Sequence, residues 1–190
     1  LLQASVNGLG SVAVASGTAA NKLNQLFGCV FDALGVSMST YGGQNIGARR
    51  AERIFPGLRA GMVIGSVYSV LALLLILFFG RPMMLLFVDS SETVIIAQAY
   101  QFIVIQAAFF IPLAGVNVIR LLVQGMGYSK LAMFAGVFEM IARGALGLFR
   151  VPRFGFLLAC FASPMAWLLA DAFLIFAYCR VMRHVRQFGR

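Results

Sequence analysis

The chain has 190 residues, of which 61% are hydrophobic and 11% charged, and its mean hydropathy is +0.92. Soluble domains are usually about half apolar and about one quarter charged, so this composition excludes an ordinary soluble domain and indicates an integral membrane protein. The formal net charge of +9 does not indicate nucleic-acid binding, because the basic residues lie between apolar runs, as in the loops of membrane proteins.

The first candidate span runs from about Val12 to Tyr41 and has one polar face. At 100° per residue, six small or polar residues share one side of this helix: Asn21, Gln25, Gly28, Asp32, Gly35 and Ser39. Two interpretations stay open. The face lines a water-filled cavity in which Asp32 binds a cation or a proton, or it is a packing seam whose polar groups bond a neighbouring helix.

The next segment, residues 42–53 with the sequence GGQNIGARRAER, interrupts the apolar pattern. Glycine and asparagine favour turns, and clustered arginines favour the membrane surface. We therefore expect a cytoplasmic loop here. Its motif residues are Gly43, Gln44, Asn45, Gly47, Ala48 and Arg49.

Four further spans are expected at residues 60–80, 93–119, 131–149 and 154–179, since each approaches or exceeds the roughly 20 residues that a spanning helix needs. The sequence thus predicts an all-α integral membrane protein with five transmembrane helices, which form one membrane domain over residues 1–190. The chain begins at Leu1 instead of Met. We therefore expect a fragment, with Leu1–Gly10 as the end of a further, truncated helix.

The later spans also contain polar side chains. Gln106 and Asn117 lie on one side of helix 93–124, with Pro112 between them, and they are further candidates for a cavity wall. Glu139 and Arg143 are four residues apart, so they share a helix face and are expected to form a buried ion pair. This pair either stabilises the bundle interior or takes part in gating or ion coupling.

The distribution of basic residues predicts the orientation in the membrane. Ten lie on the side of segment 42–53, namely Arg49, Arg50, Arg53, Arg59, Arg120, Lys130, Arg180, Arg183, Arg186 and Arg190. Three lie on the other side, namely Arg81, Arg150 and Arg153. Because cytoplasmic loops carry the excess of Lys and Arg, segment 42–53 and the C-terminus are expected to be cytoplasmic.

No pattern of catalytic or metal-binding residues is present. Cys29, Cys160 and Cys179 are far apart, and the single histidine, His184, lies in the tail. No nucleophile, base and acid occur in a known arrangement, and no glycine-rich loop ends in Lys-Ser or Lys-Thr. We therefore expect neither an enzyme nor a resident cofactor or metal.

Several of these segments together resemble one family of transporters. They are QASVNGLG at 3–10, AVASGTAANKLNQL at 13–26, GGQNIGARRAERI at 42–54, RLLVQGMGYS at 120–129 and SPMAWLLAD at 163–171. In this order the chain is similar, over its whole length, to the C-terminal half of a MATE (multidrug and toxic compound extrusion) transporter of the MOP flippase superfamily. The resemblance implies helices eight to twelve of a twelve-helix, two-lobe protein, preceded by the end of helix seven.

The resemblance also implies an activity. MATE transporters export organic cations and other amphipathic compounds in exchange for Na⁺ or H⁺, by alternating access. In some members, acidic residues on helices seven and ten bind the coupling cation. Helix 93–124 carries no acid, so Asp32 is the acid proposed for this lobe. A negative, aromatic-lined cavity, with Asn21 and Gln25 beside Asp32, would suit cationic substrates.

The sequence therefore predicts the C-terminal lobe of an antiporter of the bacterial inner membrane. Its expected partners are amphipathic or cationic small molecules, the lipid bilayer and the N-terminal lobe of the same chain. The coupling ion, Na⁺ or H⁺, stays open. Two alternatives also stay open: a lipid-linked oligosaccharide flippase of the same superfamily, which needs a more cationic cavity, and a non-transporting membrane subunit.

Overall fold

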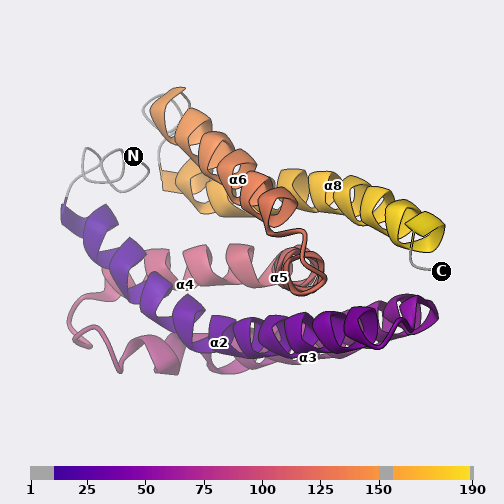
Figure 1. The fold of residues 1–190 in the computed structure, drawn as a ribbon. Helices are drawn as coiled ribbons and strands as arrows, with labels where there is room; N and C mark the ends of the chain where they lie inside the picture. Colours follow the sequence, from indigo (N-terminus) through magenta and orange to yellow (C-terminus); the bar gives the residue numbers. More distant parts are fainter. Residues whose placement is uncertain (1–10, 150–155, 189–190) are drawn as a thin grey trace.

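The computed structural model describes residues 11–149 and 156–188, which form an all-α bundle as predicted. Its elements are α2 (Ser11–Gly47), the 3₁₀ helix η1 (Ala51–Arg53), α3 (Ile54–Met84), α4 (Thr93–Ala108), α5 (Phe110–Gly125), α6 (Ser129–Phe149) and α8 (Phe156–Phe188). The truncated helix expected at Leu1–Gly10 lies outside the described residues. Figure 1 shows α4 and α5 between the α2–α3 pair and the α6–α8 pair, and α5 contacts helices of both pairs.

Helices cover the described parts of all five expected spans, and the third span is divided into α4 and α5. Fewer of these helices are both long enough and apolar enough to cross a membrane. Within the described residues, two segments are long and apolar enough to cross a membrane, Ala51–Met84 and Cys160–Val185. The count rises to three if the bent pair α4–α5 is one span. This test uses length and composition alone, and α2 and α6 do not pass it. Helices α2 and α6 contribute polar side chains to the cavity described below.

Helix α2 runs parallel to the bent pair α4–α5. Ser16 Oγ donates to Gln98 Oε1 at 3.3 Å, and Asn24 Nδ2 donates to Gln106 Oε1 at 3.5 Å, each across 82 positions of sequence. The same separation relates Gly35 to Asn117 and Gly43 to Gly125, where a β-carbon on the first glycine would lie 3.1 and 3.2 Å from the partner's carbonyl oxygen. Helix α2 is therefore in constant register with its neighbour over most of its length.

The end of α2 corrects the expected loop at residues 42–53. Gly43, Gln44, Asn45 and Gly47 belong to the helix, because Gly42 and Gly43 let it approach α5 closely. The turn begins only at Ala48. There Arg50 N–H donates to the Asn45 carbonyl and Arg49 N–H to that of Ile46, which is the Schellman pattern of a helix C-terminus. Arg49 has the left-handed φ of 56° that this position requires.

The third expected span breaks at Phe109, where α4 and α5 meet at an angle of 54°. Pro112 lies in the first turn of α5, has no N–H to donate to the carbonyl of Ala108, and its ring crowds that carbonyl. The break thus falls one helical turn before the proline. Phe109 N–H instead donates to the Gln106 carbonyl, one residue closer than in an α-helix.

Two groups of buried apolar side chains hold the bundle together. The first joins α2, α3, α4 and the beginnings of α5 and α8, and in it Phe31 packs edge-on against Tyr68 and Phe110, with ring centroids 5.1 and 5.5 Å away. The second joins α5 to α8 and to the C-terminal half of α2, and it includes Trp167 and Leu174.

The connections lie at opposite ends of the bundle. A β-carbon on Gly43 would lie 3.2 Å from the Gly125 carbonyl oxygen, so the ends of α2 and α5 adjoin. Tyr128, in the α5–α6 turn, packs its ring on His184 near the end of α8 at 6.2 Å. The α3–α4 connection lies at the other end (Figure 1). The α2–α3 and α5–α6 turns therefore lie at one end of the bundle and the α3–α4 connection at the other.

Candidate binding cavity

A cavity of about 620 Å³ lies between α2, α5, α6 and α8. Its wall consists of Thr18, Asn21, Lys22, Asn24, Gln25, Gly28 and Asp32 from α2, Leu113, Val116, Asn117 and Arg120 from α5, Glu139 and Arg143 from α6, and Trp167 from α8. The volume falls in the range of sites for small organic molecules, roughly 300–1,000 Å³. Polar and charged groups converge here from helices that are otherwise apolar.

The polar face of α2 has two different environments along its length. Asn21, Gln25, Gly28 and Asp32 lie in the cavity wall, as the cavity interpretation requires. Gly35 instead packs against α5, where a β-carbon would lie 2.5 Å from Leu121 Cδ1. The face is therefore a cavity wall in its N-terminal part and a packing seam in its C-terminal part.

The two amides predicted on the third span have different environments. Asn117 lies in the cavity wall, where its Nδ2 donates to the Leu113 carbonyl at 3.2 Å and its Oδ1 accepts from Arg120 at 3.4 Å. Gln106 is 1% exposed and lies outside the wall. Its expected place in the cavity is therefore corrected. Gln106 accepts a hydrogen bond from Asn24, and this bond joins α4 to α2.

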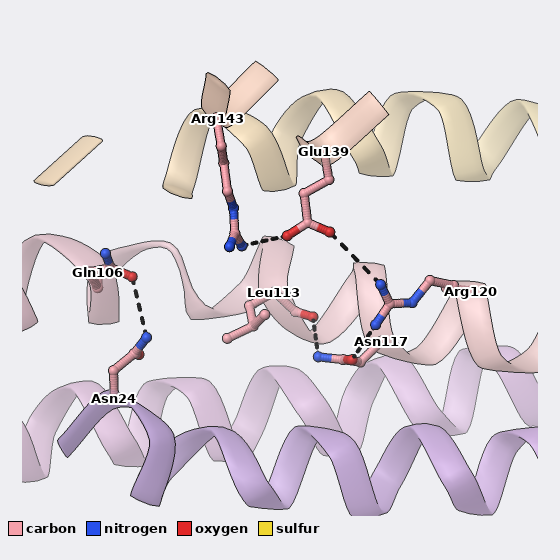
Figure 2. A network of polar contacts seen from close by, with 7 residues as sticks. All are labelled: Asn24, Gln106, Leu113, Asn117, Arg120, Glu139 and Arg143. Carbon is pink, nitrogen blue, oxygen red and sulfur yellow. Dashed lines mark hydrogen bonds and ion pairs between the residues drawn. The ribbon is translucent and has the colours of Figure 1, made fainter. Parts of the chain in front are cut away.

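Glu139 forms ion pairs with two arginines (Figure 2). Its Oε1 accepts from Arg143 Nη2 on the same helix, as the four-residue spacing predicts, and its Oε2 lies 3.8 Å from Arg120 Nη1 on α5. Sequence reasoning missed Arg120, because an arginine at the edge of an apolar run resembles a residue anchored at the membrane surface. Without Arg120 the positive-inside comparison is nine to three, and its direction is unchanged.

Lys22 adds a third basic residue to the wall. Its Nζ lies 5.8 Å from the centroid of the Phe87 ring, a cation–π distance. Among the described residues Lys22 takes part in no ion pair. Its charge is therefore not cancelled by a neighbouring carboxylate.

The charge of the cavity differs from the expectation. The wall has three basic residues, Lys22, Arg120 and Arg143, two acidic ones, Asp32 and Glu139, and one aromatic ring, that of Trp167. The formal balance is +1, so the expected negative, aromatic-lined cavity is wrong for this part of the protein. The described residues hold no group of three or more His, Cys, Asp or Glu side chains that could bind a metal ion.

Long apolar helices that enclose a polar cavity of this size are consistent with a membrane transporter. The chain belongs to the MatE family, whose description matches residues 1–149. This family consists of transporters and not of enzymes. The chain is therefore part of a multi-pass membrane protein of the MATE family, as its motifs indicated.

The fold is similar to that of a MOP superfamily transporter from Pyrococcus furiosus Vc1 (DSM3638), with a TM-score of 0.75 and 22% sequence identity. The match covers 92% of this chain and 39% of that one, so the chain spans well under half of its structural relative. For the Pyrococcus protein, reverse polarity of the binding pocket suggests a different function. No curated protein matches the chain.

Proposed function

We propose that the chain is the C-terminal lobe of a secondary active exporter, which moves drugs, organic cations or other amphipathic compounds across the bacterial inner membrane in exchange for Na⁺ or H⁺. The observation that carries the proposal is the cavity of about 620 Å³ lined by polar residues of α2, α5 and α6. A covalently joined second lobe would complete this cavity, and rocking of the two lobes would open it to each side in turn. The positive-inside bias supports a cytoplasmic C-terminus.

Asp32 is the proposed coupling residue of this lobe. It is exposed within the cavity wall and, among the described residues, makes no ion pair. A carboxylate in this setting can exchange a cation or a proton with water in the cavity. Binding of that ion would favour one orientation of the lobes over the other, which is the requirement for coupled transport.

A second candidate function is the translocation of a lipid-linked oligosaccharide. The observation that favours it is the basic character of the cavity wall, to which Lys22, Arg120 and Arg143 contribute. A pyrophosphate-linked substrate would pair with such groups. The structural relative with a pocket of reverse polarity shows that pocket charge varies within this fold.

The test is transport by the full-length transporter reconstituted into liposomes, with a Na⁺ gradient or a pH gradient imposed separately. We expect a fluorescent amphipathic dye to move under one of the two gradients, which identifies the coupling ion. If no dye moves under either gradient while the protein is shown to be inserted, the exporter proposal is wrong. Gradient-independent translocation of a fluorescent lipid phosphate in the same liposomes would favour the flippase.

A further inference from the structure

We infer that Arg120 and Arg143 form a subsite for an anionic group of the transported compound, such as a carboxylate, sulfonate or phosphate. The inference rests on the proposed function and specifies the substrate class of the same cavity. It differs from the expectation of a cavity built for organic cations.

The first argument is the ratio of charges around Glu139. Two guanidinium groups contact a single carboxylate, one at each of its oxygens (Figure 2). The Glu139 side chain is 15% exposed, whereas those of Arg120 and Arg143 are 32% and 39% exposed. The acid is thus covered, and part of each arginine stays accessible. The group formed by Arg120, Arg143 and Glu139 therefore has a formal net charge of +1, and its arginines are more exposed than its carboxylate.

The second argument is a hydrogen-bond donor without an acceptor. Nε of Arg143 is buried and finds no hydrogen-bond partner among the described residues. An unpaired buried donor costs free energy, and hydrogen bonds from arginine to an oxyanion are among the strong ones. Nε itself has no exposed surface, so a ligand oxygen would reach it only after the side chain shifts. Because a guanidinium has five N–H donors in one plane and the Arg143 side chain is 39% exposed, Arg143 can keep its bond to Glu139 and still offer other donors to a ligand oxygen.

The third argument concerns the rest of the wall. Lys22, on α2, adds a further cation without an ion pair. The acid Asp32 lies ten positions further along α2, about 15 Å from Lys22 in a helix, and the register with α5 places it about one turn from Asn117; among the described residues it makes no ion pair with Arg120 or Arg143. Leu113, Val116 and Trp167 supply an apolar surface beside the arginines. Such a wall suits an amphipathic anion with a charged group and an apolar body.

The anionic group can belong to a soluble amphiphile or to the phosphate of a lipid. Both have the same chemistry at the arginines, and the experiment separates them. The probes are a carboxylated xanthene dye, a cationic xanthene dye of similar size, and a short-chain fluorescent phosphatidic acid. Binding to the purified full-length transporter in detergent is measured by fluorescence anisotropy, and transport of the same probes is measured in liposomes.

Two substitutions of opposite sign test the subsite. Arg143→Gln is expected to weaken binding of the anionic dye roughly tenfold or more and to leave binding of the cationic dye unchanged or stronger. Glu139→Gln frees both arginines and removes a negative charge, so it is expected to strengthen binding of the anionic dye. The control is Arg59→Gln, which removes an exposed arginine of α3 outside the cavity wall and should change neither affinity.

The outcomes separate the inference from the function on which it rests. A purely structural ion pair predicts that Arg143→Gln and Glu139→Gln impair both dyes alike, and this result would overturn the subsite. If Arg143→Gln does not fold, two other variants decide: Glu139→Gln and Arg143→Lys, which keeps the positive charge. Unchanged binding of the anionic dye in Glu139→Gln contradicts the inference. Anion binding without transport of any probe would reject the exporter and keep the subsite. Effects confined to phosphatidic acid would identify a lipid phosphate as the ligand.

Discussion

Gly125, at the end of α5, lies directly against the backbone of Ser39 in α2. A β-carbon on Gly125 would come within 2.0 Å of the Ser39 carbonyl oxygen, which is far inside van der Waals contact. Because the obstacle is backbone, no side-chain rotation relieves it. The two helices can therefore keep their common register at this end of the bundle only with glycine at position 125.

Gly125→Ala is accordingly expected to destabilise the lobe by about 1–3 kcal/mol, the usual cost of overpacking. The measurement is thermal unfolding of the full-length transporter in detergent. Gly17→Ala is the matched control, because Gly17 lies within α2 and, among the described residues, no atom of another helix lies within 4 Å of the added β-carbon. That control should be neutral or stabilising, since alanine is the better helix former. Equal melting temperatures for the two variants would contradict the close contact.

Arg49→Gly is expected to stabilise the turn that follows α2. The left-handed conformation costs a non-glycine residue about 1 kcal/mol or slightly more, and Arg49 adopts it with a φ of 56°. Arg50→Gly removes the same charge at a φ of −107°, where glycine relieves no strain and only makes the unfolded chain more flexible. In thermal unfolding, the melting temperature of Arg49→Gly should be higher than that of the wild type, and that of Arg50→Gly should be lower. The reverse order would exclude this cap.

Phe31→Ala is expected to cost about 3–5 kcal/mol, as for other large aromatic residues in protein cores. Phe31 has no exposed surface and packs on both Tyr68 and Phe110, so the substitution leaves a cavity between α2, α3 and α5. Phe78→Ala removes the same group from a side chain that is 76% exposed on α3. Chemical unfolding in detergent should show little change for Phe78→Ala, and similar losses for both would refute this assignment of the core.

Asp32→Asn is expected to reduce gradient-driven transport in liposomes by roughly 5- to 150-fold, the usual range for the loss of one coupling interaction. Equilibrium binding of dye should change much less, because the amide keeps the size and polarity of the side chain. Asp89→Asn is the control, since Asp89 is an exposed acid in the α3–α4 connection. Unchanged transport and unchanged ion dependence in Asp32→Asn would remove Asp32 from the coupling mechanism.

Helix positions followed from hydrophobic runs, and their ends did not. Residues 60–80 lie inside α3 and residues 131–149 inside α6, because long apolar runs leave no other structure available in a membrane. Segment 42–47 was assigned to a loop from its glycines and asparagine. In the folded chain these glycines serve close contact with α5, and Asn45 Nδ2 donates to the Tyr41 carbonyl of its own helix. Glycine is favoured both in turns and where two helices come close together. The sequence alone therefore did not distinguish a loop from a closely packed helix end at residues 42–47.

The cavity followed only in part from the sequence. Helical periodicity placed Asn21, Gln25 and Asp32 on one face, and the four-residue spacing paired Glu139 with Arg143, because both relations are local to one helix. The contact of Arg120 with Glu139 and the burial of Gln106 depend on how α5 and α4 pack against other helices. A single sequence contains no direct record of that packing. For this reason the formal charge of the cavity wall is positive in the structure, whereas a negative charge was expected from the sequence.

Helix α2 has 37 residues and is therefore about 55 Å long, longer than the roughly 30 Å of hydrocarbon in a bilayer. Its helical hydrogen bonding continues from the cavity wall through Gly47 to the arginine-rich turn. Figure 1 shows that α2 bends beside the bent pair α4–α5, so the lever is its C-terminal part; from Asp32 to Gly47, about 22 Å, a tilt of about 10° gives a displacement of about 4 Å at the end. A small rotation that opens or closes the cavity would thus move the turn at the membrane surface by several ångströms. A spectroscopic label at that turn would report the orientation of the lobe without touching the binding site.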